Sequence, residues 1–273
     1  MTVFLTDRDV GVAELARAVE ERGFASLFLP EHTHIPVRRA TPAPTGEHPL
    51  PGAYARTLDP WVALSAAGAV TTRLRLGTGV SLPAQHDPIA LAKQIATLDH
   101  LSGGRVTLGV GYGWNFEEIA DHGIDPQRRR AVVREHILAM QALWRDDVAS
   151  FDGEHVAFEP SWAWPKPVQR PRVRTLVGGA AGPTLVAHLA EWADGWLPVG
   201  GAGIAEALPR LRAALAEAGR DPATLQVVPL GTEPSAGKLE HFRELGVTEV
   251  ALRVAAGGRD VVLPALDALT AYL

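Results

Sequence analysis

Four consecutive residues, Glu31-His32-Thr33-His34, place a carboxylate and two imidazoles directly after the short apolar run Ser26–Leu29. An imidazole can take or give a proton near neutral pH, and a neighbouring carboxylate can fix which ring nitrogen carries it. We therefore interpret His32 as a candidate acid/base residue. The alternative is a loop histidine bonded to the backbone, and for His34 the sequence favours neither interpretation.

The stretch from Leu74 to Asn115 indicates how such a cluster is positioned. Leu74–Ser81 is an apolar run with glycines near its end, which is typical of a buried parallel strand. Asp87-Pro88 has the residue types of a helix start, and that helix ends at Ser102-Gly103-Gly104. Val106–Val110 is a second apolar run. The pattern is strand, crossover helix, strand, as parallel pairing requires.

The same alternation of strand and helix continues through the chain. The predicted strands are Val3–Leu5, Ser26–Leu29, Leu74–Ser81, Val106–Val110, Thr175–Val177, Gly195–Val199, Gln226–Leu230 and Glu249–Val254. Eight strands, each followed by a helix, favour a single α/β domain over residues 1–273, a (β/α)8 TIM barrel, rather than a doubly wound sheet. Residues 36–57, after the second strand, and 145–174, before the fifth, are predicted insertions. A barrel carries its active site at the carboxyl ends of its strands, where the 31–34 cluster falls.

Composition excludes several classes of protein. The 273 residues are 47% hydrophobic and 21% charged, with a formal net charge of −5, which argues against nucleic acid as a partner. The absence of cysteine excludes disulfides, thiolate metal sites and a cysteine nucleophile. No apolar run reaches the roughly 18 residues of a membrane span, and the first residues do not resemble a signal peptide. We expect a soluble, cytoplasmic protein with no membrane partner.

Two glycine-rich turns are candidate anion sites. Gly178–Thr184 enters a helix, where free backbone N–H groups and the positive helix end attract anions. Gly257–Asp260 is a rival, because many barrels bind phosphate near their last strands. The residues themselves do not rank the two. The G-x-G-x-G run from Gly109 to Gly113 departs from the dinucleotide fingerprint, so we reject Rossmann-type binding.

His-x-His also suggests a metal site at His32 and His34. A barrel metallohydrolase needs further histidine or aspartate ligands at later strand ends. Those ends carry glycine, proline and alanine here, and we expect no metal.

Several motifs in register resemble the luciferase-like monooxygenase superfamily. They are Glu31-His32, LGTGVSLP from Leu76, ATLDHLSGGRVTLGVGYGWN from Ala96, VGGAAGPT from Val177 and ADGWLPVGG from Ala193. Together they span nearly the whole chain. GWN followed by Glu117-Glu118, and His122-Gly123, resemble the actinobacterial subgroup that uses the deazaflavin coenzyme F420.

The resemblance implies a TIM barrel that binds F420, or alternatively FMN, across the strand ends. His32 matches the active-site histidine of the family, and Glu31 the acidic residue beside the ring. A non-proline cis peptide is expected at Gly79-Val80, as a bulge behind the ring. The implied cofactor-binding residues are Gly79, Val80, Ser81, Gly111, Gly113, Trp114, Asn115, Gly178, Gly179, Ala180, Ala181, Gly182 and Thr184. Of these, the residues from Gly178 to Thr184 are expected to hold the phosphate.

The resemblance leaves three functions open. The first is F420-dependent hydride transfer to or from a small-molecule substrate, with His32 as acid/base. The second is an FMN-dependent monooxygenase served by a separate flavin reductase, and the third is a flavin-binding barrel without turnover. Trp114 and Ala202 replace an acid and a lysine of the sugar-phosphate dehydrogenase branch, which argues against glucose 6-phosphate as substrate. Family members are often dimers, so a homodimer is also expected.

Overall fold

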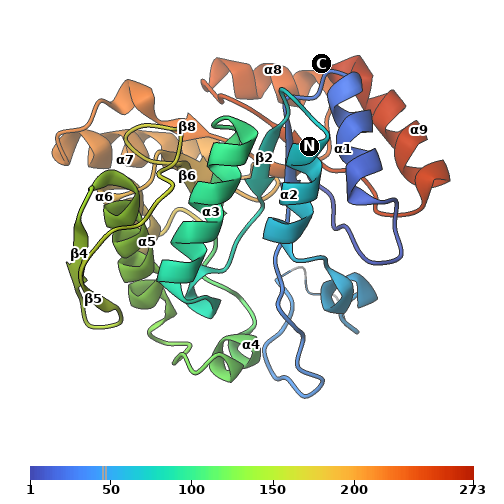
Figure 1. Cartoon of the computed structure of the whole chain (residues 1–273). Helices are drawn as coiled ribbons and strands as arrows, with labels where there is room; N and C mark the ends of the chain where they lie inside the picture. Colours follow the sequence, from blue (N-terminus) through green and yellow to red (C-terminus); the bar gives the residue numbers. More distant parts are fainter. Residues whose placement is uncertain (45, 47) are drawn as a thin grey trace.

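Parallel strands form a ring in the computed structural model, which describes residues 1–44, 46 and 48–273 (Figure 1). Six strands pair in the order β1-β2-β3-β6-β7-β8, and β9 pairs with β10. Isolated bridges close the ring, because Val199 pairs with Leu230 and Thr2 pairs with both Phe28 and Arg253. The strands are β1 Ser26–Leu29, β2 Arg75–Thr78, β3 Val106–Val110, β6 Arg174–Gly178, β7 Gly195–Leu197, β8 Gln226–Val227, β9 Leu230–Thr232 and β10 Ala251–Leu252.

Helices alternate with these strands and cover the outside of the ring (Figure 1). They are α1 Val12–Glu21, α2 Pro60–Ala69, α3 Pro88–Ser102, α5 Arg129–Arg145, α6 Pro183–Glu191, α7 Ile204–Glu217, α8 Ala236–Glu244 and α9 Arg259–Leu269. Asp59 and Asp87 accept hydrogen bonds from the first-turn amides of α2 and α3, which begin with proline as predicted. The structure confirms the predicted TIM-barrel class of fold.

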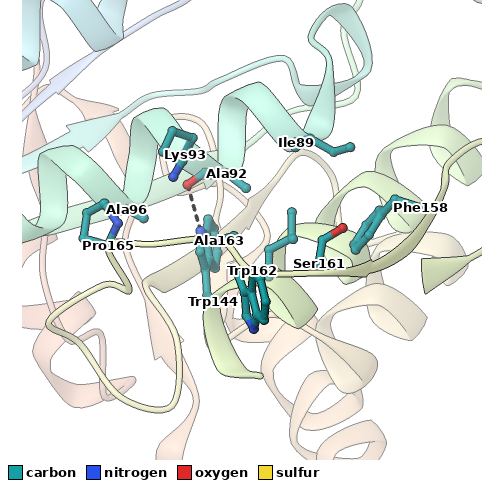
Figure 2. Close-up of a pocket in the computed structure, with 11 residues that line it drawn as sticks. Ile89, Ala92, Lys93, Ala96, Trp144, Phe158, Ser161, Trp162, Ala163 and Pro165 are labelled. Atoms are coloured by element: carbon teal, nitrogen blue, oxygen red, sulfur yellow. Dashed lines mark hydrogen bonds between the residues drawn. The ribbon is translucent and has the colours of Figure 1, made fainter. Parts of the chain in front are cut away.

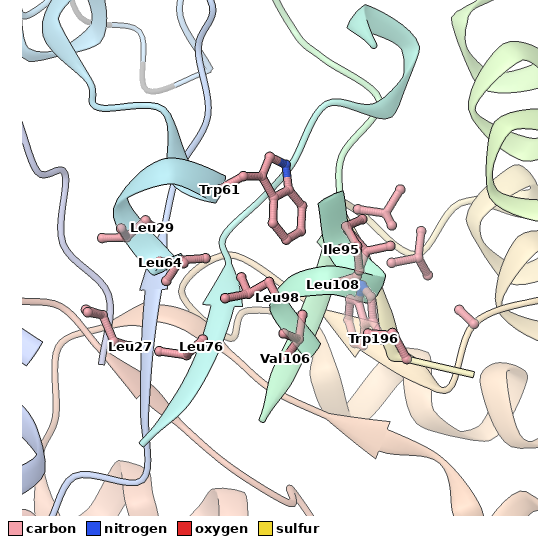
Figure 3. Close-up of a cluster of buried hydrophobic side chains, with 14 of the residues drawn as sticks. Leu27, Leu29, Trp61, Leu64, Leu76, Ile95, Leu98, Val106, Leu108 and Trp196 are labelled. Carbon is pink, nitrogen blue, oxygen red and sulfur yellow. The ribbon is translucent and has the colours of Figure 1, made fainter. Parts of the chain in front are cut away.

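Alternate residues of the strands face the two sides of the ring. Leu27 and Leu29 pack with the helices in the outer core (Figure 3), whereas Phe28 between them belongs to a separate inner cluster. A Cβ atom on Gly77 would lie 2.4 Å from the Phe28 ring, so the glycine makes room for that ring. The inner cluster also holds Leu176, Leu197, Val228, Leu230 and Ala251, with Val80 packed against it.

Two of the predicted strands are absent or divided, and four others differ in their bounds. Leu74–Ser81, Gly195–Val199 and Glu249–Val254 are shorter as β2, β7 and β10, and Thr175–Val177 is longer as β6. Val3–Leu5 forms no strand, because the isolated bridges fall on either side of it. Thr2 pairs with Phe28 and Arg253, Thr6 pairs with Thr57, and Leu5 O accepts from the amide of Leu58. The run Gln226–Leu230 is divided into β8 and the start of β9, because Pro229 has no N–H group to donate.

Both predicted insertions contain regular structure that the sequence did not indicate. Residues 36–57 include the 3-10 helix η1, Gly52–Arg56, and Thr45 and Glu47 of this loop lie outside the described residues. Residues 145–174 include the antiparallel hairpin of β4, Ala149–Asp152, and β5, Ala157–Ser161. A further short helix, α4, Phe116–Asp121, follows β3. In the part of the chain that the structure describes, each helix is too short or too polar to cross a membrane.

Candidate active site

The carboxyl ends of β1, β2 and β3 bring several predicted site residues together. Hydrogen bonds join the residues after β1 to the turn after β2 and to α4, which follows β3. This edge of a parallel barrel is where active sites form. Side chains separated by 50 to 86 positions in sequence contact each other here.

His32 is held by a carboxylate from α4. Its Nδ1 lies 2.9 Å from Oε2 of Glu118, and the two side chains are only 6% and 1% exposed. Oε1 of Glu118 accepts a second hydrogen bond, from the amide of Thr33 at 3.1 Å. One carboxylate therefore fixes both the imidazole and the peptide that follows it. Nε2 makes no hydrogen bond to any residue that the structure describes.

Two aromatic rings flank the imidazole of His32. The ring centroid of Tyr54 lies 5.3 Å from it, and that of Trp114 lies 5.7 Å away in an edge-on arrangement. Tyr54 and Trp114 also contact each other edge to face at 5.9 Å. Tyr54 comes from η1, so the long loop after β1 contributes to the site. Such edge-to-face packing restricts the ring orientations and makes the surroundings apolar.

Glu31 contacts the turn after β2. The residue is 3% exposed, and its carboxylate accepts from Ser81 Oγ at 2.6 Å and from the Leu82 amide at 2.5 Å. The other oxygen lies 2.7 Å from His86 Nε2. Both oxygens are occupied by protein groups, so Glu31 orders this turn. Its predicted role beside a bound ring stays a prediction.

Glu31 and His86 each stabilise the charged form of the other. Burial alone would raise the pKa of Glu31, but the hydrogen bond and charge of His86, with the donors of Ser81 and Leu82, hold it below its usual value. Burial alone would lower the pKa of His86, and Glu31 instead raises it. The pair is therefore charged between these two pKa values.

The structure confirms the expected cis peptide bond between Gly79 and Val80. The Val80 side chain lies between the ends of two neighbouring strands. A Cβ atom on Gly111 would be 2.4 Å from Val80 Cγ2, and one on Gly178 would be 2.9 Å from Val80 Cγ1. Ser81 continues the pairing beyond this bend, since its amide donates to Gly109 O at 2.7 Å. The structure thus brings Gly79, Val80, Ser81, Gly111 and Gly178 together, and their role in binding a cofactor stays a prediction.

The turn from Gly178 to Thr184 leads into α6. Gly182 is the N-cap of that helix, and within the described part of the chain no side chain caps its first-turn amides. A Cβ atom on Gly182 would contact nothing within 4 Å, and Gly179 and Ala180 are exposed. The carbonyl of Gly179 accepts from Trp196 Nε1 at 2.8 Å, which fixes the start of the turn. Uncapped amides at a helix N-terminus suit a phosphate.

Two buried polar side chains beyond β3 and on β9 have atoms without partners among the described residues. Asn115, the N-cap of α4, is 1% exposed, and neither its Oδ1 nor its Nδ2 makes a hydrogen bond to any of these residues. The hydroxyl of Thr232, at the end of β9, is also buried and has no partner among them. Unsatisfied buried polar groups are costly, so their position at this edge is consistent with a polar ligand there.

His34 lies outside this arrangement. Its side chain is 42% exposed, and its Nε2 lies 3.0 Å from Asp121 Oδ2. Thr33 Oγ1 joins His34 to His122, whose pKa is lowered by burial and by the neighbouring His34. These residues attach α4 to the segment after β1.

An acidic cluster and a pocket among the described residues lie apart from the predicted site residues. Among the described residues, Glu135, Glu154 and His155 bring possible metal-ligand atoms within 4.8 Å of one another, but the set excludes His32 and His34. A pocket of about 120 Å³ lies on the outside of the barrel, between α3, α5 and β5 with the segment after it (Figure 2). Trp144 is one of its lining residues, and its Nε1 donates to Ala92 O at 3.0 Å.

Sequence reasoning missed three residues of this site. Tyr54 lies in a loop without periodicity, and His86 follows a turn that no motif marks. Glu118 was noted only as part of a motif. Two adjacent acids, Glu117 and Glu118, follow GWN, and only the unforeseen helix α4 decides which of them reaches His32.

Comparison with known proteins identifies relatives over most of the chain. The family model described as luciferase-like monooxygenase matches residues 11–238. An uncharacterized protein of Mycobacterium tuberculosis (strain ATCC 25618 / H37Rv) is 51% identical over 253 residues, which cover 92% of this chain and 89% of that protein.

Relatives with named activities are more distant. An F420-dependent glucose-6-phosphate dehydrogenase of Beutenbergia cavernae is 34% identical over 72% of this chain, and the match spans 55% of that enzyme. An FMNH2-dependent dimethylsulfone monooxygenase of Pseudomonas putida is 31% identical over 45% of this chain and 35% of its own.

The fold also matches a solved structure over its full length. An F420-dependent secondary alcohol dehydrogenase in complex with an F420-acetone adduct superposes with a TM-score of 0.78. The match covers 100% of this chain and 98% of the other chain. Because the sequence identity is 18%, the match shows similarity of the fold alone.

Proposed function

Because this chain belongs to the luciferase-like monooxygenase family of oxidoreductases, we propose that it is an F420-dependent oxidoreductase with His32 as its acid/base residue. The bound deazaflavin would supply or accept a hydride. The protein would position the substrate, exclude water and move the accompanying proton.

The residues at the strand ends fit such a cofactor. In this proposal the Gly79-Val80-Ser81 bend supports the ring system, while Gly111, Gly113, Trp114 and Asn115 line its edge. The side-chain amide of Asn115, which has no partner in the described part of the chain, has both a donor and an acceptor to offer a polar ring. The phosphate would bind to the uncapped amides of α6 and the turn Gly178, Gly179, Ala180, Ala181, Gly182 and Thr184.

One observation carries the role of His32. Its Nδ1 is bonded to a buried carboxylate, and its Nε2 is unbonded among the described residues, at the edge of the barrel that binds ligands. A general acid/base residue needs one nitrogen free to exchange a proton and a fixed ring orientation. His32 has both.

The substrate is proposed to be uncharged near the reacting atom. Besides the carboxylate on Nδ1, His32 is flanked by the rings of Tyr54 and Trp114, which favour an apolar group. Arg56, close to Tyr54 in sequence, is paired with Asp7. Trp114 also stands where the sugar-phosphate branch has an acid, so glucose 6-phosphate is not the proposed substrate.

FMN-dependent monooxygenation is the second candidate, favoured by the match to the Pseudomonas putida enzyme. The same turn could bind either ribityl phosphate, and the FMN enzyme would need a separate flavin reductase as its partner. Titration of the purified protein with F420 and with FMN, followed by fluorescence, separates the two. We expect saturable F420 binding at least about tenfold tighter than FMN binding. Tight FMN binding and oxygen uptake with reduced FMN would overturn the F420 proposal.

A further inference from the structure

Glu118 is a carboxylate enclosed by protein. Its side chain is 1% exposed, and its two oxygens accept from two different groups, His32 Nδ1 and the Thr33 amide. A buried charge is tolerated only when hydrogen bonds replace its lost water. These two bonds do so, and they tie α4 to the residues that follow β1.

Neighbouring acids of α4 contact other parts of the same segment. Glu117 Oε1 accepts from the amides of Ala40 and Thr41, and Asp121 pairs with His34. Three acids on one short helix therefore contact the segment after β1, and among them Glu118 reaches His32. Glu117 provides a matched comparison, because it is adjacent in sequence and binds backbone rather than the imidazole.

The contact determines which nitrogen carries the proton. An ionised carboxylate can only accept, so Nδ1 of a neutral imidazole must be the donor, and Nε2 keeps its lone pair. We propose that Glu118 is the positioning residue of His32, fixing the Nδ1–H tautomer so that Nε2 exchanges a proton with the substrate. The proton exchange in this inference rests on the proposed function. The assignment of the tautomer rests only on the contact between Glu118 and His32.

The proton balance follows from that assignment. The bound deazaflavin would supply the hydride for the carbon of a carbonyl substrate. His32 would give its Nε2 proton to the carbonyl oxygen, so the Nε2–H bond would break as the O–H bond forms. The imidazolium of His32 would become neutral imidazole, and Nδ1 would keep its proton, donated to Glu118, throughout. Oxidation of an alcohol would reverse each of these changes.

The first test uses the protein without added cofactor. Nitrogen-15 NMR of the imidazole rings, with the His32 signals assigned through His32→Gln, reports the tautomer in alkaline buffer. We expect wild type to show a protonated Nδ1 and an unprotonated Nε2. Glu118→Gln offers one acceptor oxygen for two donors, and its NH2 group can face the ring, so it should give a mixed or reversed tautomer. Glu117→Gln should leave the His32 signals unchanged.

The second test measures turnover with the cofactor that binds. Removing the orienting carboxylate should lower kcat by at least about 100-fold with KM changed only a few-fold. Glu118→Asp should have a higher rate than Glu118→Gln, because a carboxylate is present again. The control Glu117→Gln should keep most of the wild-type rate. Circular dichroism and thermal melting check that each variant is folded.

The outcomes separate this inference from the proposed function. If His32 keeps the same tautomer in Glu118→Gln, or if kcat is unchanged, Glu118 does not position His32. If neither cofactor supports turnover, the proposed function fails, and the NMR result alone decides whether Glu118 fixes the tautomer.

Discussion

Replacing Glu31 by glutamine should destabilise the protein strongly although the change in size is small. Glu31 is buried and accepts from Ser81, Leu82 and His86. Breaking a buried ion pair by removing one charge costs about 3–5 kcal/mol. Glutamine keeps one acceptor oxygen, so we take the lower value, about 3 kcal/mol. For a chain of this size that lowers Tm by about 6–12 °C.

Thermal and urea unfolding measure this loss, and Glu14→Gln provides the control. Glu14 pairs with Arg259 at the surface, and exposed pairs contribute little, so its Tm should change by less than about 2 °C. A double-mutant cycle of Glu31→Gln with His86→Gln should give a coupling of about 1–3 kcal/mol. A Tm within about 2 °C of wild type for Glu31→Gln would refute the assignment of Glu31 to the turn after β2.

The effect should also depend on pH in a defined direction. The pKa of Glu31 is lowered from 4.5, so its contribution is present above pH 4.5 and is lost as pH falls through the lower folded value. The pKa of His86 is raised from 6.5, so its contribution is complete below pH 6.5 and is lost as pH rises through the folded value. The difference in unfolding free energy between wild type and Glu31→Gln should therefore be largest between pH 4.5 and 6.5. A difference that keeps growing above pH 8 would contradict this sign.

Three further substitutions test the proposed site. His32→Ala should lower kcat by about 10²–10⁴ while cofactor affinity, from fluorescence titration, stays within a few-fold; an unchanged rate removes His32 from the mechanism. Gly111→Ala should lose about 1–3 kcal/mol in urea unfolding, because its Cβ would lie 2.4 Å from Val80, and adding Val80→Ala should recover part of the loss. Gly182→Ala should keep its Tm, since the new Cβ contacts nothing within 4 Å, but should weaken cofactor binding at least about tenfold. Equal affinity would place the phosphate elsewhere.

Local signals predicted most of the barrel. Ser26–Leu29 and Val106–Val110 are strands with the predicted bounds, because each is a buried apolar run next to a glycine- or proline-containing turn. Aspartate followed by proline marked the starts of α2 and α3, since capping and a fixed φ act within one turn.

The unpredicted parts depend on contacts between distant residues. The hairpin of β4 and β5 packs its Phe151 and Phe158 rings together, and a single run does not show that pairing. The short helix α4 is held by its acids against the segment after β1. His32 was predicted from its position at a strand end, but its partner is 86 residues away. Only the folded chain brings the two together.

Two carboxylate–histidine pairs lie at the same edge of the barrel. They differ in whether a ring nitrogen remains available to a substrate. Glu31 accepts three hydrogen bonds from protein groups, and His86 Nε2 is one of the three donors. Glu118 accepts two and leaves Nε2 of His32 without a partner among the described residues. If the first pair serves structure and the second chemistry, Glu31→Gln should reduce stability and cofactor affinity together. Glu118→Gln should instead reduce kcat far more than either. Loss of rate without loss of stability in Glu31→Gln would reverse these two assignments.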